Sequence, residues 1–193
     1  NLAPAFVKDG LRVLIVDGDP QGTATRWAAA ASDNNQYPAP IIGLSHASEK
    51  AHNEIKKHIL NYDIILVDCP PAAESLFSQS SLLVADLVLV PIKPTPPDLW
   101  GAVGIKKVIN SILVQNENLI PRLVISMRQT NSMNNDVLSI LKDFGIEMLN
   151  SHIFQRTIYT QASLGTSVLN LKDQKAIAEI KGLHKEVKKL LKL

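Results

Sequence analysis

The sequence contains one cysteine, carries a net charge of only +2 and has no apolar run long enough to span a membrane. A lone cysteine, Cys69, cannot form an internal disulfide and agrees with a reducing cytoplasm. The small net charge gives no general signal for nucleic acid, so any such contact must come from a local cluster of charge. No glycine is followed directly by lysine, which excludes a Gly-Lys phosphate loop within these residues.

What the sequence does contain is an alternation of apolar strand patterns with helical patterns along 193 residues, 46% of them hydrophobic. This alternation predicts an α/β fold, with a mostly parallel twisted sheet and helices on both faces, in a single domain over 1–193. The predicted strands are 12–16, 64–67, 87–90, 123–126 and 147–153. The predicted helices are 23–31, 47–60, 74–84, 99–115, 134–144, 159–165 and 173–193, and 33–40 is predicted to be a loop.

Two of the predicted strands end in aspartate. Asp17 and Asp19 follow the aliphatic run 13–16, and Asp68 ends the aliphatic run 64–67. In open α/β sheets the ligand site lies beyond the carboxyl ends of the strands, where carboxylates can hold Mg²⁺ or a water beside a phosphate. The alternative is that these residues only form turns with the prolines that follow them.

Three segments together resemble one family. They are V-D-G-D-P-Q-G at 16–22, Y-D-I-I-L-V-D-C-P-P at 62–71, and V-P-I-K-P-T-P-P-D-L-W-G at 90–101. Their order and spacing resemble the ParA group of the ParA/MinD deviant-Walker ATPases, over nearly the whole chain. The resemblance implies a P-loop NTPase fold and ATP and Mg²⁺ as cofactors.

The same resemblance implies roles for individual residues. Asp17 holds a water of the Mg²⁺ shell, Asp68 binds Mg²⁺ through water, and Asp19 orients the water that attacks the γ-phosphate. Two switch loops are expected at 20–25 and 70–75, the first with Pro20 and Gln21 near the nucleotide. The residues expected near the adenine are Met127, Arg128, Gln155 and Arg156.

The family's phosphate loop, K-G-G-x-G-K-T-T, has no counterpart in these 193 residues. Such a loop supplies the backbone N–H groups, the lysine and the hydroxyl that hold the phosphates and Mg²⁺. These 193 residues alone are therefore expected to be inactive toward ATP. We expect that the natural protein carries the loop ahead of Asn1, together with a strand that is central in the family's sheet.

The segment 173–193 is predicted to form a helix with one apolar face and a stripe of lysines on the other. The stripe consists of Lys181, Lys185, Lys188 and Lys192. The stripe can be a solvated surface, a site for DNA phosphates, or the polar face of an interfacial membrane helix. Together with Arg156, these lysines are the DNA-binding candidates. A membrane role is disfavoured because the segment aligns with the ordinary terminal helix of ParA proteins.

The resemblance implies a cytoplasmic, nucleoid-associated partition ATPase that segregates plasmids or chromosomes. ATP is expected to drive homodimer formation and non-specific DNA binding, and a centromere-binding partner of the ParB or ParG kind is expected to stimulate hydrolysis. Two alternatives remain: a MinD-like membrane-associated positioning ATPase, and a non-catalytic scaffold that truly lacks the phosphate loop.

Overall fold

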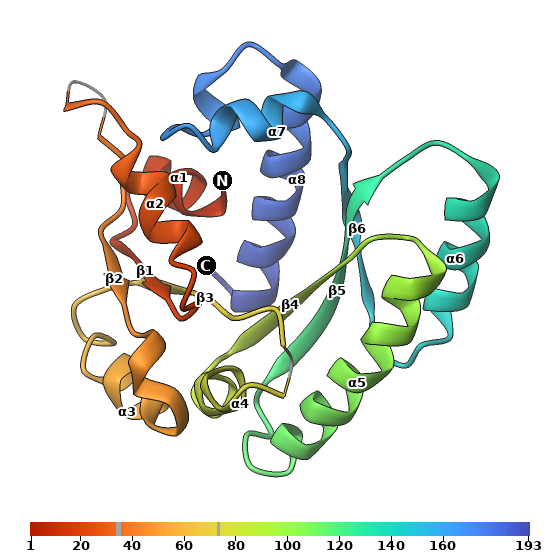
Figure 1. Cartoon of the computed structure of the whole chain (residues 1–193), viewed down its shortest axis with the longest axis horizontal. Helices are drawn as coiled ribbons and strands as arrows, with labels where there is room; N and C mark the ends of the chain where they lie inside the picture. The colour runs from red at the N-terminus through yellow and green to blue at the C-terminus, as the bar shows by residue number, and fades with distance from the viewer. Residues whose placement is uncertain (34–35, 73) are drawn as a thin grey trace.

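The computed structural model describes residues 1–33, 36–72 and 74–193. Within these residues, no helix is both long enough and apolar enough to cross a bilayer. The chain alternates between helices and strands over its whole length (Figure 1). The elements are α1 (Leu2–Lys8), β1 (Val13–Asp17), α2 (Thr23–Ala29), β2 (Ile41–Gly43), η2 (Ser45–Lys50), α3 (Ala51–Lys56), β3 (Ile64–Asp68), α4 (Leu76–Leu82), β4 (Leu87–Ile92), α5 (Pro96–Leu113), β5 (Ile120–Arg128), α6 (Ser132–Lys142), β6 (Met148–Phe154), α7 (Thr157–Ala162), η3 (Val168–Asn170) and α8 (Gln174–Leu191).

The strands form two parallel sheets of three strands each, in the orders β2-β1-β3 and β4-β5-β6. The prediction of a parallel α/β fold is therefore confirmed. In the part of the chain that the structure describes, β3 and β4 are not hydrogen-bonded to each other. All strands of one sheet run the same way, so their carboxyl ends share one edge, and this edge carries the residues considered below.

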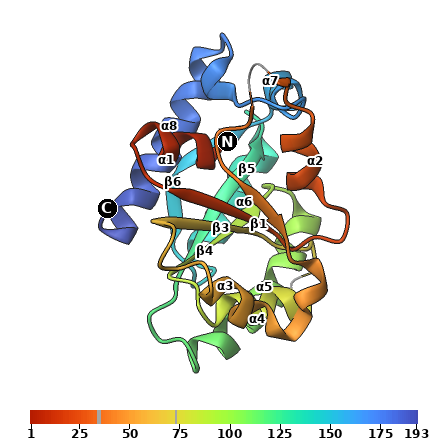
Figure 2. The same cartoon turned by 90° about the vertical axis from the view of Figure 1, so that its left-hand side faces the viewer.

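Helices cover both faces of the strands, and one apolar cluster joins the two sheets. On one face α1 and α8 lie side by side, and Phe6 of α1 packs with Leu183 of α8 over strands of both sheets (Figure 2). On the other face α3 and α4 cover β1, and α5 and α6 cover β4 and β5. Because β1 is covered on both faces, each of its residues is buried, as its uninterrupted aliphatic run predicts.

Several described elements differ from the predicted ones. The short strand β2 was not predicted. The helix predicted over 47–60 is divided into η2 and α3, and η2 itself contains a kink at Ser48, whose φ is 46°. Pro4 is the third residue of α1, in the first turn, where a proline nitrogen has no intrahelical bond to lose. The predicted loop 33–40 includes residues 34–35, and the predicted switch loop 70–75 includes residue 73. The helix predicted over 74–84 begins next to residue 73. These three residues lie outside the described ones.

Candidate functional site

Three carboxylates meet where β1 and β3 end. Asp17 and Asp68 are register partners in the two adjacent strands, and the N–H of Gly18 donates to the carbonyl oxygen of Asp68 at 2.8 Å. Asp19 follows directly. Partial burial, followed by the negative charges of Asp17 and Asp19, raises the pKa of Asp68. The structure thus brings these predicted site residues together at the carboxyl edge of the first sheet.

Asp17 is the most enclosed of the three, with 1% of its surface exposed. Its Oδ2 accepts hydrogen bonds from the backbone N–H of Thr25 at 2.8 Å and from the Thr25 hydroxyl at 2.7 Å. Its Oδ1 accepts from the N–H of Asp19 at 3.3 Å. A buried carboxylate needs such partners, and here they tie the first turn of α2 to the end of β1. Thr25 ends the predicted switch loop 20–25, but its hydrogen bonds to Asp17 were not predicted, because only the folded loop brings it back to that residue.

Asp19 lies in a turn that its own side chain stabilises. Its Oδ1 accepts from the N–H of Gln21 at 2.8 Å, and its carbonyl oxygen accepts from the N–H of Gly22 at 2.9 Å. This is the Asx-type turn that Pro20 favours. Pro20 and Gln21 are exposed on its outer side. The Asp19 carboxylate can still accept further hydrogen bonds beside the one in the turn, since each oxygen can accept two.

A second group of predicted residues meets at the carboxyl ends of β5 and β6. The N–H of Gln155 donates to the carbonyl oxygen of Arg128 at 3.0 Å, and the side chains of Gln129 and Gln155 are hydrogen-bonded. The Arg128 guanidinium lies 2.5 Å from His152 Nδ1, and burial together with this positive charge lowers the pKa of His152. The two predicted adenine segments are therefore neighbours, and Met127 in the first of them has an unusual positive φ of 51°.

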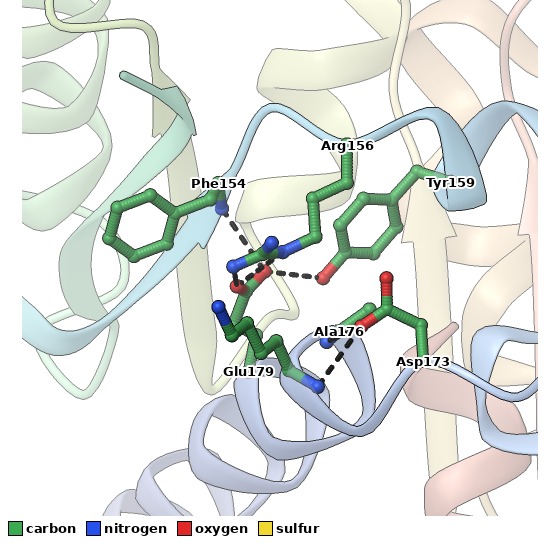
Figure 3. Close-up of polar contacts among 7 residues, drawn as sticks. Phe154, Arg156, Tyr159, Asp173, Ala176 and Glu179 are labelled. Carbon is green, nitrogen blue, oxygen red and sulfur yellow. Dashed lines mark hydrogen bonds and ion pairs between the residues drawn. The ribbon is translucent and has the colours of Figure 1, made fainter. Parts of the chain in front are cut away.

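Arg156 does not extend freely into solvent. Its Nε and Nη2 donate to Glu179 of α8 at 2.8 and 2.6 Å, and the Tyr159 hydroxyl donates to the same carboxylate at 2.8 Å (Figure 3). The N–H of Phe154 adds a fourth bond at 3.1 Å. Burial and the Glu179 carboxylate raise the pKa of Tyr159. This network fixes the segment between β6 and α7 onto α8.

The acidic residues of α8 and its cap all face inward. Asp173 caps the first turn by accepting from the N–H groups of Lys175 and Ala176, both at 3.0 Å. Glu186 accepts from the backbone N–H groups of Asn150 and Ser151 at 2.9 and 2.6 Å. With Glu179 also engaged, the outer face of α8 is left to lysines.

The lysine stripe differs from the prediction at one position. Lys188 is half-buried and pairs with Asp9 at the end of α1, so it leaves the exposed face. Lys189 is exposed and takes its place, because 185 and 189 are one helical turn apart. We define the lysine stripe as Lys181, Lys185, Lys189 and Lys192, all exposed.

The carboxylates do not form a ready metal cage. Within residues 1–33, 36–72 and 74–193, no group of three or more His, Cys, Asp or Glu side chains is placed to hold a metal ion. Asp17 is enclosed and accepts hydrogen bonds from Thr25 and Asp19, whereas Asp68, although partly desolvated, is the more accessible to solvent of the two. Of the two residues predicted to hold Mg²⁺ through water, Asp68 is the better placed.

Comparison with known proteins gives one family match and several similar proteins. Residues 41–125 match a family described as an AAA domain. The "Maintenance of carboxysome distribution protein A" of Halothiobacillus neapolitanus is 27% identical over 191 residues, covering 97% of this chain and 87% of that protein. The "Chromosome-partitioning ATPase Soj" of Thermus thermophilus is 27% identical over 148 residues, covering 64% of this chain and 58% of that protein.

Solved structures agree in fold. Apo McdA of Cyanothece superposes with a TM-score of 0.78 at 14% identity, covering 96% of this chain and 91% of that one. MinD in the MinC:MinD complex of Aquifex aeolicus gives 0.73 at 16% identity, covering 98% and 88%. This chain is similar in sequence to ParA-type proteins and has the ParA/MinD fold, as the three sequence segments predict. In the ParA-type fold the two clusters described above both lie at the edge where ligands of parallel α/β sheets bind.

Proposed function

We propose that this ParA-type chain supplies the Mg²⁺-binding and water-orienting side of an ATP-hydrolysing positioning protein. The observation that carries the proposal is the meeting of Asp17, Asp19 and Asp68 at one sheet edge. Positioning and electrostatics account for most of the catalysis of phosphoryl transfer, and carboxylates there serve the cation and the attacking water. Bound Mg²⁺ would neutralise phosphate charge, with Asp68 holding one of its waters and Asp17 securing α2.

The cluster of Met127, Arg128, Gln155 and Arg156 is proposed as the adenine side of the same site. Its backbone is fixed by β5–β6 pairing and by the Glu179 network, which supports a preformed contact. The amides of Gln129 and Gln155 can offer both donors and acceptors to a base edge. In this arrangement Arg156 acts mainly by holding its segment.

The cargo is proposed to be DNA or a DNA-tethered assembly, moved through an ATP-dependent homodimer and a partner of the ParB or ParG kind, in the cytoplasm at the nucleoid. The names of the relatives favour a second candidate, carboxysome positioning, with a different partner. A MinD-like membrane role is less consistent with the structure. The apolar face of α8, with Ile180, Leu183 and Val187, is buried against the body of the fold and cannot enter a membrane while docked.

The proposed activity is tested by adding the phosphate loop that these 193 residues lack. We expect the 193-residue chain to bind no ATP in equilibrium dialysis, because no phosphate loop is present. A chain with a strand and a K-G-G-x-G-K-T-T loop of the family pattern joined ahead of Asn1 should bind ATP and hydrolyse it in a Mg²⁺-dependent way. A folded chimera that binds ATP but shows no hydrolysis with or without Mg²⁺ would contradict the proposal and favour a scaffold.

The lysine stripe predicts salt-dependent DNA binding. Replacing its four lysines with alanine should reduce the magnitude of the slope of log K against log salt by about 3.6, since each phosphate contact contributes about 0.9. The measurement is fluorescence anisotropy with a duplex of random sequence at several low salt concentrations. The matched control replaces four exposed lysines elsewhere and removes the same charge: Lys50, Lys56, Lys107 and Lys142. Equal losses in both variants would show that only net charge matters and would remove the stripe as a site.

A further inference from the structure

Gly18, which separates the two aspartates of the first motif, lies directly under the ring of Phe77. A Cβ built on Gly18 would be 1.9 Å from Cε1 and 2.3 Å from Cζ of Phe77, far inside contact distance. The φ angle of Gly18 is not positive, so its backbone is one that any residue adopts. Glycine is therefore needed here for the close approach of Phe77.

Phe77 is held firmly in this place. It is the second residue of α4, is 4% exposed, and packs in the apolar cluster that contains Leu14 and Val16 of β1 and Ile55 of α3. The N-cap of α4 is also fixed, because the Ser75 side chain accepts from the N–H of Ser78 at 3.0 Å. The ring cannot withdraw from Gly18 unless α4 itself moves.

The peptide under the ring also links the two sides of the carboxylate site. The N–H of Gly18 makes the 2.8 Å hydrogen bond to the Asp68 carbonyl oxygen, which joins the end of β1 to the end of β3. Phe77 thus covers the residue that lies between Asp17 and Asp19 and donates a hydrogen bond to Asp68. The helix that carries Phe77 begins just after the 70–75 segment, the predicted second switch loop.

We propose that Phe77 is a positioning residue, which couples α4 to the placement of Asp19 relative to Asp68. The inference rests on the proposed function, because the placement of Asp19 relative to Asp68 matters only if these carboxylates serve ATP hydrolysis. When α4 shifts, the Gly18 peptide loses its cover, its bond to Asp68 weakens, and the water-orienting carboxylate moves. Packed elements transmit small shifts in this way because interiors are dense and yield little.

The test measures the hydrogen bond between the Gly18 N–H and the Asp68 carbonyl oxygen, and it needs no nucleotide. In a Phe77→Leu variant of the 193-residue chain, native-state hydrogen exchange of the Gly18 amide should become about tenfold faster. The control is the Ile15 amide in the same strand, which donates to the Pro40 carbonyl at 3.0 Å and should change little. Equal acceleration at Gly18 and Ile15, or none at Gly18, would overturn the inference, because a merely structural role affects both alike.

A reciprocal pair of variants keeps the proposal testable if the ring proves hard to replace. Gly18→Ala should lower the Tm by several degrees, since the new methyl group meets the ring. The same change in a Phe77→Ala background should cost nothing further. An equal Tm loss in both backgrounds would show that Phe77 does not determine the residue at 18. These results stand or fall separately from ATP hydrolysis, so a failure of the coupling is distinguishable from a failure of the proposed function.

Discussion

Replacing Asp19 with asparagine should lower ATP turnover by about 10²- to 10⁴-fold while ATP affinity stays within a few-fold, in the chimera that carries a phosphate loop. The asparagine side chain can still accept from the N–H of Gln21, so the turn after β1 survives. What is lost is the negative charge that would hold and polarise the attacking water. Single-turnover hydrolysis and nucleotide binding, measured on the same sample, separate the two effects.

A second substitution at this position separates turn formation from chemistry. Asp19→Ala removes both the charge and the turn hydrogen bond, so it should match the asparagine variant in turnover and add some loss of stability. Asp143→Asn, at an exposed residue after α6, is the control and should leave turnover unchanged. If Asp19→Asn hydrolysed ATP normally and only Asp19→Ala failed, Asp19 would be a turn residue and not part of the mechanism.

The sequence predicted the parts of this site that depend on local pattern. Uninterrupted aliphatic runs predicted β1 and β3, and the aspartates that end them lie together because parallel neighbours finish at one edge. The same argument explains why Arg128 and Gln155 are neighbours at the ends of β5 and β6. In each case the strand itself determines where the polar residue lies.

Contacts between distant segments were not predictable from the sequence. No role was predicted for Gly18, and its place beneath a ring 59 residues later appears only in the folded chain. The spacing of Lys188 predicts that it belongs to the lysine stripe, but in the structure it forms an ion pair with Asp9 at the end of α1. The strand β2 has three residues, too few for a periodic pattern to show. The sequence did not predict the tertiary contacts, namely which helix covers which strand and which residue of opposite charge lies near a given side chain.

The Glu179 carboxylate is the clearest such contact, and its removal should be costly. Glu179→Ala should lower the free energy of unfolding by about 3 kcal/mol, because it leaves Arg156, the Tyr159 hydroxyl and the Phe154 N–H without their shared acceptor. The side chain of Glu179 is only 10% exposed, so water replaces those bonds poorly. With a urea m-value of about 2 kcal/mol/M, the midpoint should fall by about 1.5 M.

Two comparisons show whether this loss comes from the network. Glu117→Ala, at an exposed glutamate after α5, should change the midpoint little. The double variant Arg156→Ala with Glu179→Ala should be no less stable than Glu179→Ala alone, since the unpaired guanidinium is then gone as well. Strictly additive losses would mean that Arg156 does not depend on Glu179. Non-additive losses would mean that α8, through one buried carboxylate, holds in place the segment proposed to contact the adenine, while its opposite face presents the lysine stripe.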